Sequence, residues 1–241
     1  MEPPPLNDSG ADTLATRVQL VRSRISRAAI KVGRKPQDIR LVAATKTVTV
    51  DRMRAAIEAG LSIVGENRLQ EASPKMAALK DAPVRWHFIG HLQRRKARSV
   101  IGVFDLVHSV DSLELAQEIN KRAGQAAVCQ EVLLEVNLGQ EPTKSGFHPE
   151  DLIALVPALG SLPCLRVKGL MIIPPPTAKA EQARPYFSRL RHMAERIAAL
   201  RLPTITMDEL SMGMSHDFEI AIEEGATLVR VGAAIFGARH V

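Results

Sequence analysis

The sequence predicts a protein of the α/β class that folds as a single (β/α)8 TIM barrel with an additional N-terminal helix. Three observations support this fold. Short β-branched runs alternate with helical stretches after residue 39, and this alternation implies a parallel sheet. Eight such units fit within about 200 residues, which favours a closed barrel. The chain has 241 residues and is 46% hydrophobic, enough to bury one large core.

The first element is a long amphipathic helix over residues 11–32. Its apolar residues recur near the helical period, at Leu14, Val18, Val21, Ile25 and Ile30. Residues 1–10 are rich in proline and polar residues, so they are expected to be disordered. We therefore expect one barrel domain over residues 11–241.

The strands are predicted where short runs are rich in β-branched and apolar residues: 41–45, 62–65, 85–89, 105–109, 132–137, 167–173, 209–212 and 227–231. The helices are predicted in the stretches that accompany them: 50–59, 67–79, 92–100, 112–123, 149–159, 179–200 and 215–224. An open doubly wound sheet is the alternative fold. The loop after the first strand has no glycine-rich phosphate turn, which argues against it.

The last predicted strand is flanked by residues that suit an anion. Ser215 stands where it could cap the helix before this strand, and Gly232 ends the strand. Because another helical turn can begin at Ala233, the N–H groups of Gly232 and Ala233 would point at whatever lies above the strand. The alternative is an ordinary strand, turn and helix that binds no anion. In that case glycine is needed at position 232 only because it can adopt the backbone angles of the turn.

Lys46 directly follows the first predicted strand. Barrel enzymes carry their chemistry at the carboxyl ends of the strands, and barrel closure makes the first and eighth strands neighbours. Lys46 would then approach Arg230 and the N–H groups near Gly232. A lysine amine forms an imine with an aldehyde, so an aldehyde, an aromatic ring and a phosphate fit together, as in pyridoxal 5′-phosphate (PLP). A lysine that extends from the rim into solvent is the alternative.

Several motifs carry a resemblance to a known family. They read AATKT at 43–47, GENR at 65–68, WHFIGHLQ at 86–93, GLM at 169–171, LSMGMS at 210–215 and VRVG at 229–232. In these motifs the chain resembles the pyridoxal phosphate homeostasis protein family, which is related in fold to the barrel domain of alanine racemase. The resemblance covers nearly the whole chain after residue 12.

The resemblance implies that PLP is the cofactor. Lys46 would form a Schiff base with its aldehyde, and Ser215, Gly232 and Ala233 would hold its phosphate. Family members usually carry a hydroxyl residue at the position of Ala233. One side-chain hydrogen bond to phosphate is therefore missing here, while the backbone N–H remains.

Four further residues are implied to surround the ring. Arg230 would face the pyridine nitrogen, and Asn67 would lie near the phenolic oxygen. Met171 and His91 would line the pocket. A guanidinium can only donate hydrogen bonds, so Arg230 would leave the ring nitrogen unprotonated and weaken carbanion stabilisation.

A binding protein is the leading hypothesis for the function. In racemase relatives the second base is a tyrosine of a separate domain, whereas the one tyrosine here, Tyr186, starts a predicted outer helix. The chain would hold PLP, buffer its aldehyde and pass it to apo-enzymes through transient contacts, as a monomer and without turnover. The alternative is a PLP-dependent amino-acid racemase or lyase that uses Lys46 as its base.

Composition narrows the other possibilities. The net charge of +6 and the basic segment 91–98 would suit a nucleic-acid-binding barrel, but aromatic residues for base stacking are nearly absent, so a solvated helix face is preferred. Within this segment, Arg95 replaces a smaller polar residue usual in the family. No apolar run approaches the length of about 18 residues that a membrane span needs. Cys129 and Cys164 indicate reduced thiols and no metal site, so a cytoplasmic location is expected.

Two weaker groups of candidates remain. Glu141, Lys144 and Gly146 match a family pattern after the fifth strand, but a surface salt bridge beside a turn glycine explains them equally well. Trp86 and His87 interrupt an apolar strand. A hydrogen-bonded core histidine is more common there than a catalytic one.

Overall fold

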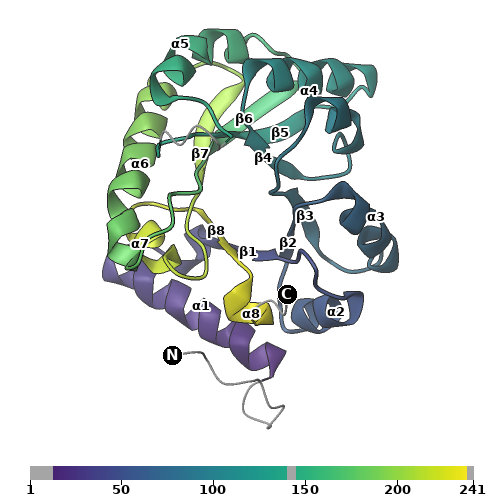
Figure 1. The fold of residues 1–241 in the computed structure, drawn as a ribbon, viewed down its shortest axis with the longest axis vertical. Coiled ribbons are helices and arrows are strands. Elements are labelled where there is room, and N and C mark those ends of the chain that lie inside the picture. The colour runs from purple at the N-terminus through teal and green to yellow at the C-terminus, as the bar shows by residue number, and fades with distance from the viewer. Residues whose placement is uncertain (1–12, 140–144, 238–241) are drawn as a thin grey trace.

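The computed structural model describes residues 13–139 and 145–237 and contains a closed parallel barrel in which the strand order follows the sequence (Figure 1). The strands are β1 (Arg40–Ala44), β2 (Ile63–Glu66), β3 (Arg85–Phe88), β4 (Leu106–Val110), β5 (Gln130–Glu135), β6 (Leu165–Met171), β7 (Ile205–Ser211) and β8 (Leu228–Val231). The predicted (β/α)8 class is confirmed. The prediction for residues 1–10 lies outside the described residues.

The helices form a ring around the strands (Figure 1). They are α1 (Leu14–Lys31), α2 (Val50–Glu58), α3 (Leu69–Ala78), α4 (Leu113–Gln125), α5 (Pro149–Gly160), α6 (Arg184–Ala198), α7 (Phe218–Glu223) and α8 (Ala233–Phe236), with 3-10 turns η1 (Pro36–Asp38), η2 (Arg94–Ser99) and η3 (Ala180–Ala183). The additional N-terminal helix is present as α1, which starts where the Thr13 hydroxyl accepts the N–H of Thr16. It packs against α2, α7 and α8.

Two predicted helices differ from the structure. Residues 92–100 form only the 3-10 turn η2, whose N-cap residue, Gln93, makes no side-chain capping hydrogen bond. The predicted helix 179–200 is divided into η3 and α6, because Pro185 lacks a backbone N–H and is accommodated in the first turn of a new helix. In the structure, α6 carries Tyr186 on the outer ring, where it packs against the core outside the barrel.

Alternate residues of each strand face opposite sides of the barrel wall. Val42 faces the lumen and Ala43 faces the helices, so the apolar core has two parts. The lumen cluster is small and consists of Val42, Ile63, Leu106, Leu133, Met171 and Leu228, with Ile89 beside it. The outer cluster lies between strands and helices and contains most of the buried apolar residues.

The outer layer also holds a buried ion pair. Lys75 of α3 lies 2.8 Å from Glu66 Oε1 of β2, and it also donates to the backbone oxygen of Thr45 at 2.7 Å. The hydroxyl of Thr45 donates to the same Glu66 oxygen at 2.6 Å. These contacts tie α3 to the ends of β1 and β2. No helix of the described residues is long and apolar enough to cross a membrane.

Candidate functional site

Barrel closure brings the ends of β1 and β8 together. The two strands pair in parallel, with Ala43 opposite Val231. A Cβ at Gly232 would come within 3.3 Å of both the Cβ and the backbone oxygen of Ala44, so the glycine allows close approach. Lys46 follows two residues after Ala44 and is half-buried. The predicted lysine and glycine therefore extend from adjacent strand ends.

Unused backbone donors lie at the start of α8. Among the described residues, the N–H groups of Gly232 and Ala233 donate no hydrogen bond to another backbone group, whereas the next N–H, of Ala234, donates to Ser215 Oγ at 3.3 Å. Ser215 therefore lies beside the predicted phosphate donors. Because these N–H groups point away from the helix that follows them, they can accommodate an anion.

Ser215 does not cap the preceding helix, and that prediction is wrong. The N-cap residue of α7 is Asp217, and its Oδ1 accepts the N–H of Met214 at 2.7 Å. This side-chain bond closes the turn before the helix, so the Ser215 hydroxyl is left to face α8. Gly225 follows the end of α7 with a φ of 106°, as a helix-terminating glycine does.

Asn67 and His91 come from neighbouring loops, after β2 and β3. A Cβ at Gly90 would lie 2.2 Å from the backbone oxygen of Asn67, so these loops pack directly on each other. Asn67 Oδ1 is buried without a hydrogen-bond partner among the described residues. His91 is exposed, with its Nδ1 3.3 Å from Asp111 Oδ2 and 3.1 Å from Ser145 Oγ. Asn67 thus retains hydrogen-bonding capacity, while His91 lies at the rim.

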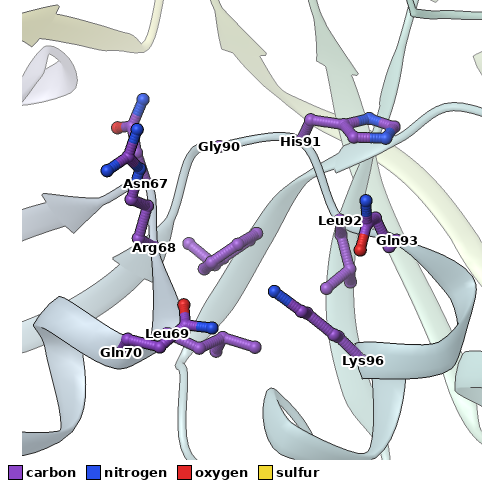
Figure 2. A pocket seen from close by; sticks show the side chains of 10 residues that line it. Asn67, Arg68, Leu69, Gln70, Gly90, His91, Leu92, Gln93 and Lys96 are labelled. Atoms are coloured by element: carbon purple, nitrogen blue, oxygen red, sulfur yellow. The ribbon is translucent and has the colours of Figure 1, made fainter.

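A cavity of about 300 Å³ lies between these loops and the basic turn η2 (Figure 2). Phe88 and Gln70 are among its lining residues, and the side chain of Lys96 points into it. In the same view, the ring of His91 is directed away from Asn67. The cavity therefore extends sideways from Asn67 toward the segment that carries Arg95.

Arg230 is buried in the lumen beneath the mouth. One guanidinium nitrogen donates to Ser211 Oγ, and the other donates to the backbone oxygen of Ile172 at 2.8 Å. Burial lowers the pKa of Arg230 to about 10, although Glu135 and Asp217 oppose this shift. The side chain remains a cation at neutral pH and can only donate.

Met171 belongs to the lumen cluster and is 1% exposed. It lies on β6 in register with Glu135 of β5. The Glu135 pKa is raised to about 7 by burial and by the nearby Asp111, against the opposing effect of Arg230. This carboxyl was missed from the sequence, although Glu135 follows the lumen residue Leu133 by two positions on β5, and this spacing could have placed it in the lumen.

His87 is buried and hydrogen-bonded, as predicted, and it has a partner that was missed. His87 Nδ1 lies 3.0 Å from His108 Nε2, and His108 Nδ1 lies 2.9 Å from Ser211 Oγ. His108 follows Leu106 by two positions on β4, and this spacing could have placed it in the lumen. Trp86 packs partly buried against the outer cluster.

The weaker candidates after β5 are described only in part. Glu141 and Lys144 lie outside the described residues. Gly146 has a φ of 121°, and a Cβ there would lie 2.8 Å from the backbone nitrogen of Asn137, so the turn requires glycine. Within residues 13–139 and 145–237, no three His, Cys, Asp or Glu side chains gather as metal ligands.

Comparison with known proteins shows the family to which the chain is related. Residues 19–240 match the family model of the alanine racemase N-terminal domain. A pyridoxal phosphate homeostasis protein of Aquifex aeolicus (strain VF5) is 45% identical over 223 residues, covering 92% of this chain and 97% of the relative. Another from Pseudomonas aeruginosa is 45% identical over 227 residues, covering 94% and 96%.

A solved structure extends the comparison. PipY of Synechococcus elongatus PCC7942 with PLP bound is 36% identical, with a TM-score of 0.82 over 93% of this chain and 100% of that one. The resemblance carried by the sequence motifs is confirmed. The chain therefore belongs to the alanine racemase N-terminal domain family and, within it, to the pyridoxal phosphate homeostasis proteins.

Proposed function

We propose that this chain binds PLP at the barrel mouth, holds it as a Schiff base on Lys46 and takes part in intracellular PLP homeostasis. It would keep the reactive aldehyde bound and release it to apo-enzymes. The main support for the proposal is the pairing of β1 with β8. This pairing brings together the two strand ends after which Lys46 and Gly232 follow. The PLP complex of PipY, at 36% identity, supports the same ligand.

The described residues fit the chemical groups of PLP. The N–H groups of Gly232 and Ala233 suit its phosphate, together with the Ser215 hydroxyl. Asn67 has a buried amide oxygen without a partner among the described residues, so its amide can serve the ring substituents. When bound, PLP supplies an electrophilic aldehyde and an electron-withdrawing ring.

The same residues favour binding over turnover. Arg230 can only donate a hydrogen bond to the ring nitrogen, so this side chain does not supply the ring proton that would make the ring a strong electron sink. Tyr186 packs on the outer ring and cannot act as a base in the lumen. We therefore propose that the protein stores and passes on PLP without converting amino acids.

One observation keeps the racemase or lyase alternative in view. Burial holds the Glu135 carboxyl at a pKa of about 7, so it can hold or give up a proton near neutral pH. Deuterium incorporation at the α-carbon of a panel of amino acids tests this directly. Wash-in that disappears in both Lys46→Ala and Glu135→Gln would establish an enzyme, and its absence across the panel would leave the carrier.

The anchor is tested by borohydride reduction of the PLP-treated protein, followed by mass mapping of the modified peptide. We expect the phosphopyridoxyl group on Lys46, and loss of the visible absorbance in Lys46→Ala. Lys121→Ala is the matched control, because Lys121 lies exposed on the outer helix α4. Modification that spreads over surface lysines and leaves Lys46 free would refute the site.

Delivery is tested separately. PLP-loaded protein is mixed with an apo-enzyme in the presence of a phosphatase that destroys free PLP. Reactivation that resists the phosphatase indicates transfer between the two proteins. Reactivation that the phosphatase abolishes would reduce the role to storage with release into solution.

A further inference from the structure

Four side chains form a continuous polar line across the barrel lumen. His87 of β3 contacts His108 of β4 at 3.0 Å, and His108 contacts Ser211 of β7 at 2.9 Å. Ser211 accepts a hydrogen bond from Arg230 of β8. All four residues are at most 5% exposed. The line therefore connects Arg230, beneath the mouth, with a histidine pair deeper in the lumen.

The chemistry of arginine sets a direction for this line. A guanidinium has no acceptor, so Ser211 Oγ must accept from Arg230. Ser211 can then give its own proton to His108 Nδ1. His108 consequently carries its proton on Nε2 and donates to His87 Nδ1, which places the proton of His87 on Nε2. Every donor points from Arg230 toward His87.

The opposite direction satisfies fewer groups. If His108 Nδ1 donated to Ser211, the hydroxyl proton of Ser211 would need another acceptor, and no further hydrogen bond of Ser211 Oγ is found among the described residues. His87 Nε2 has no partner among these residues in either case. The reverse order would therefore leave two buried groups unsatisfied instead of one, at a cost in free energy.

The surroundings keep both rings neutral, as the line requires. Burial, together with the charges of Arg85 and Arg40, lowers the pKa of His87 to about 3, against the opposing effect of Asp105. Burial also lowers the pKa of His108 well below its usual range, aided by His87, Arg230 and Arg40. A neutral imidazole can accept at one nitrogen and donate at the other.

We propose that Ser211, His108 and His87 are positioning residues that fix the guanidinium of Arg230 toward the mouth of the barrel. Ser211 and the backbone oxygen of Ile172 together take two of its donors, which leaves the remaining N–H groups for a ligand. The proposal rests on the proposed function only in that this ligand is PLP. The direction of the line is a property of the protein alone.

The direction is tested on the ligand-free protein by nitrogen NMR of labelled histidine. We expect His87 and His108 both as neutral Nε2–H tautomers, and slow exchange of the Arg230 guanidinium protons that becomes fast in Ser211→Ala. A His108 tautomer protonated on Nδ1 would overturn the proposal. Because no PLP is present, this result stands whether or not the protein binds PLP.

The positioning role is tested with two substitutions at one site. His108→Asn places an amide oxygen near the Nδ1 position and can still accept from Ser211, whereas His108→Gln places its amide near Nε2 and cannot. We expect His108→Gln and Ser211→Ala to weaken PLP binding about tenfold and to shift the absorbance of the bound PLP. His108→Asn should show the smaller effect on both.

Thermal unfolding of the three variants separates positioning from a structural role. If all three lose stability to the same extent but bind PLP with the affinity and spectrum of the wild type, the line is structural and the positioning role is refuted. If the wild type itself binds no PLP, the proposed function fails, while the NMR result still decides the direction of the line.

Discussion

The lumen and the outer layer of this barrel are both buried, yet they are built differently. The outer layer is a large apolar cluster, and it includes an ion pair in which Lys75 neutralises Glu66. The lumen has a small apolar cluster and a polar line that ends at a cation, Arg230, held by neutral groups. The packing that stabilises the fold therefore lies mainly between the strands and the helices. The polar groups that can bind a ligand lie in the lumen.

This difference follows from what each region must satisfy. Most side chains of the outer layer are covered by helices, so a charge that is buried there requires a nearby partner. Side chains near the mouth of the lumen can be completed by a ligand. Asn67 and the N–H groups of Gly232 and Ala233 accordingly retain unused hydrogen-bonding capacity among the described residues.

The largest effect is expected in the outer layer. Phe187→Ala removes a fully buried side chain of α6 and leaves a cavity, which should lower the free energy of unfolding by about 3 to 5 kcal/mol. Urea denaturation measures this loss. The spectrum of PLP bound to the folded variant should not change. A changed spectrum would mean that the two regions are not separate.

The two charges of the ion pair in the outer layer should be coupled in their effect on stability. Lys75→Met leaves the carboxylate of Glu66 buried without its cation, so the free energy of unfolding should fall by about 3 kcal/mol. Adding Glu66→Gln removes the second charge and should recover most of the loss. If the double variant is no more stable than Lys75→Met, the charges are not what couples these residues.

The Glu135 carboxyl of the lumen should make the free energy of unfolding depend on pH. The Glu135 pKa is raised from 4.5 to about 7, mainly by burial, so the folded protein keeps this proton where the unfolded chain has lost it. Its contribution is complete below pH 4.5 and is lost as the pH rises through about 7. Relative to Glu135→Gln, the wild type should lose about 3 kcal/mol across this range.

Denaturant titrations at a series of pH values measure that difference. Glu114→Gln, on the outer helix α4, is the control and should leave the pH profile unchanged. The difference in free energy of unfolding between the wild type and Glu135→Gln could instead stay constant across the pH series. The Glu135 carboxyl would then lie in an environment like that of the surface.

The smallest effect on stability is expected for Arg230. Arg230→Met loses two hydrogen bonds, but it also removes a cation whose burial is unfavourable, so the free energy of unfolding should change by less than about 1 kcal/mol. The affinity for PLP should nevertheless fall at least about tenfold. A loss of stability as large as that of Phe187→Ala would show that the lumen line is part of the stabilising core.

Much of the fold was predictable because each strand carries its own signal. The β-branched runs placed the strands of the barrel, and the order of strands and helices implied its closure. β7 was predicted to start four residues late, because its first half, Ile-Thr-Met-Asp, is polar at alternate positions and includes Met207 at a φ of 60°. Local polarity concealed a strand that neighbouring strands hold in place.

The candidate site was predictable only where one residue type has a distinctive chemistry. Lys46 after a strand and Gly232 before a helix could be recognised singly, whereas the line from His87 to Arg230 could not. His108 and Ser211 lie 103 positions apart, and strand alternation says that each faces the lumen without saying that they touch. Pairing across a lumen depends on barrel closure, for which the sequence has no local signal.

The contact between Gly232 and Ala44 also has a consequence for the biosynthesis of this protein. During translation the segment with Lys46 leaves the ribosome long before the segment with Gly232, since 186 positions separate the two residues. A partly synthesised chain therefore has the amine without the N–H groups beside it. A ligand that needs both segments is bound only after the last strand has joined the first, and such a ligand stabilises the completed barrel selectively.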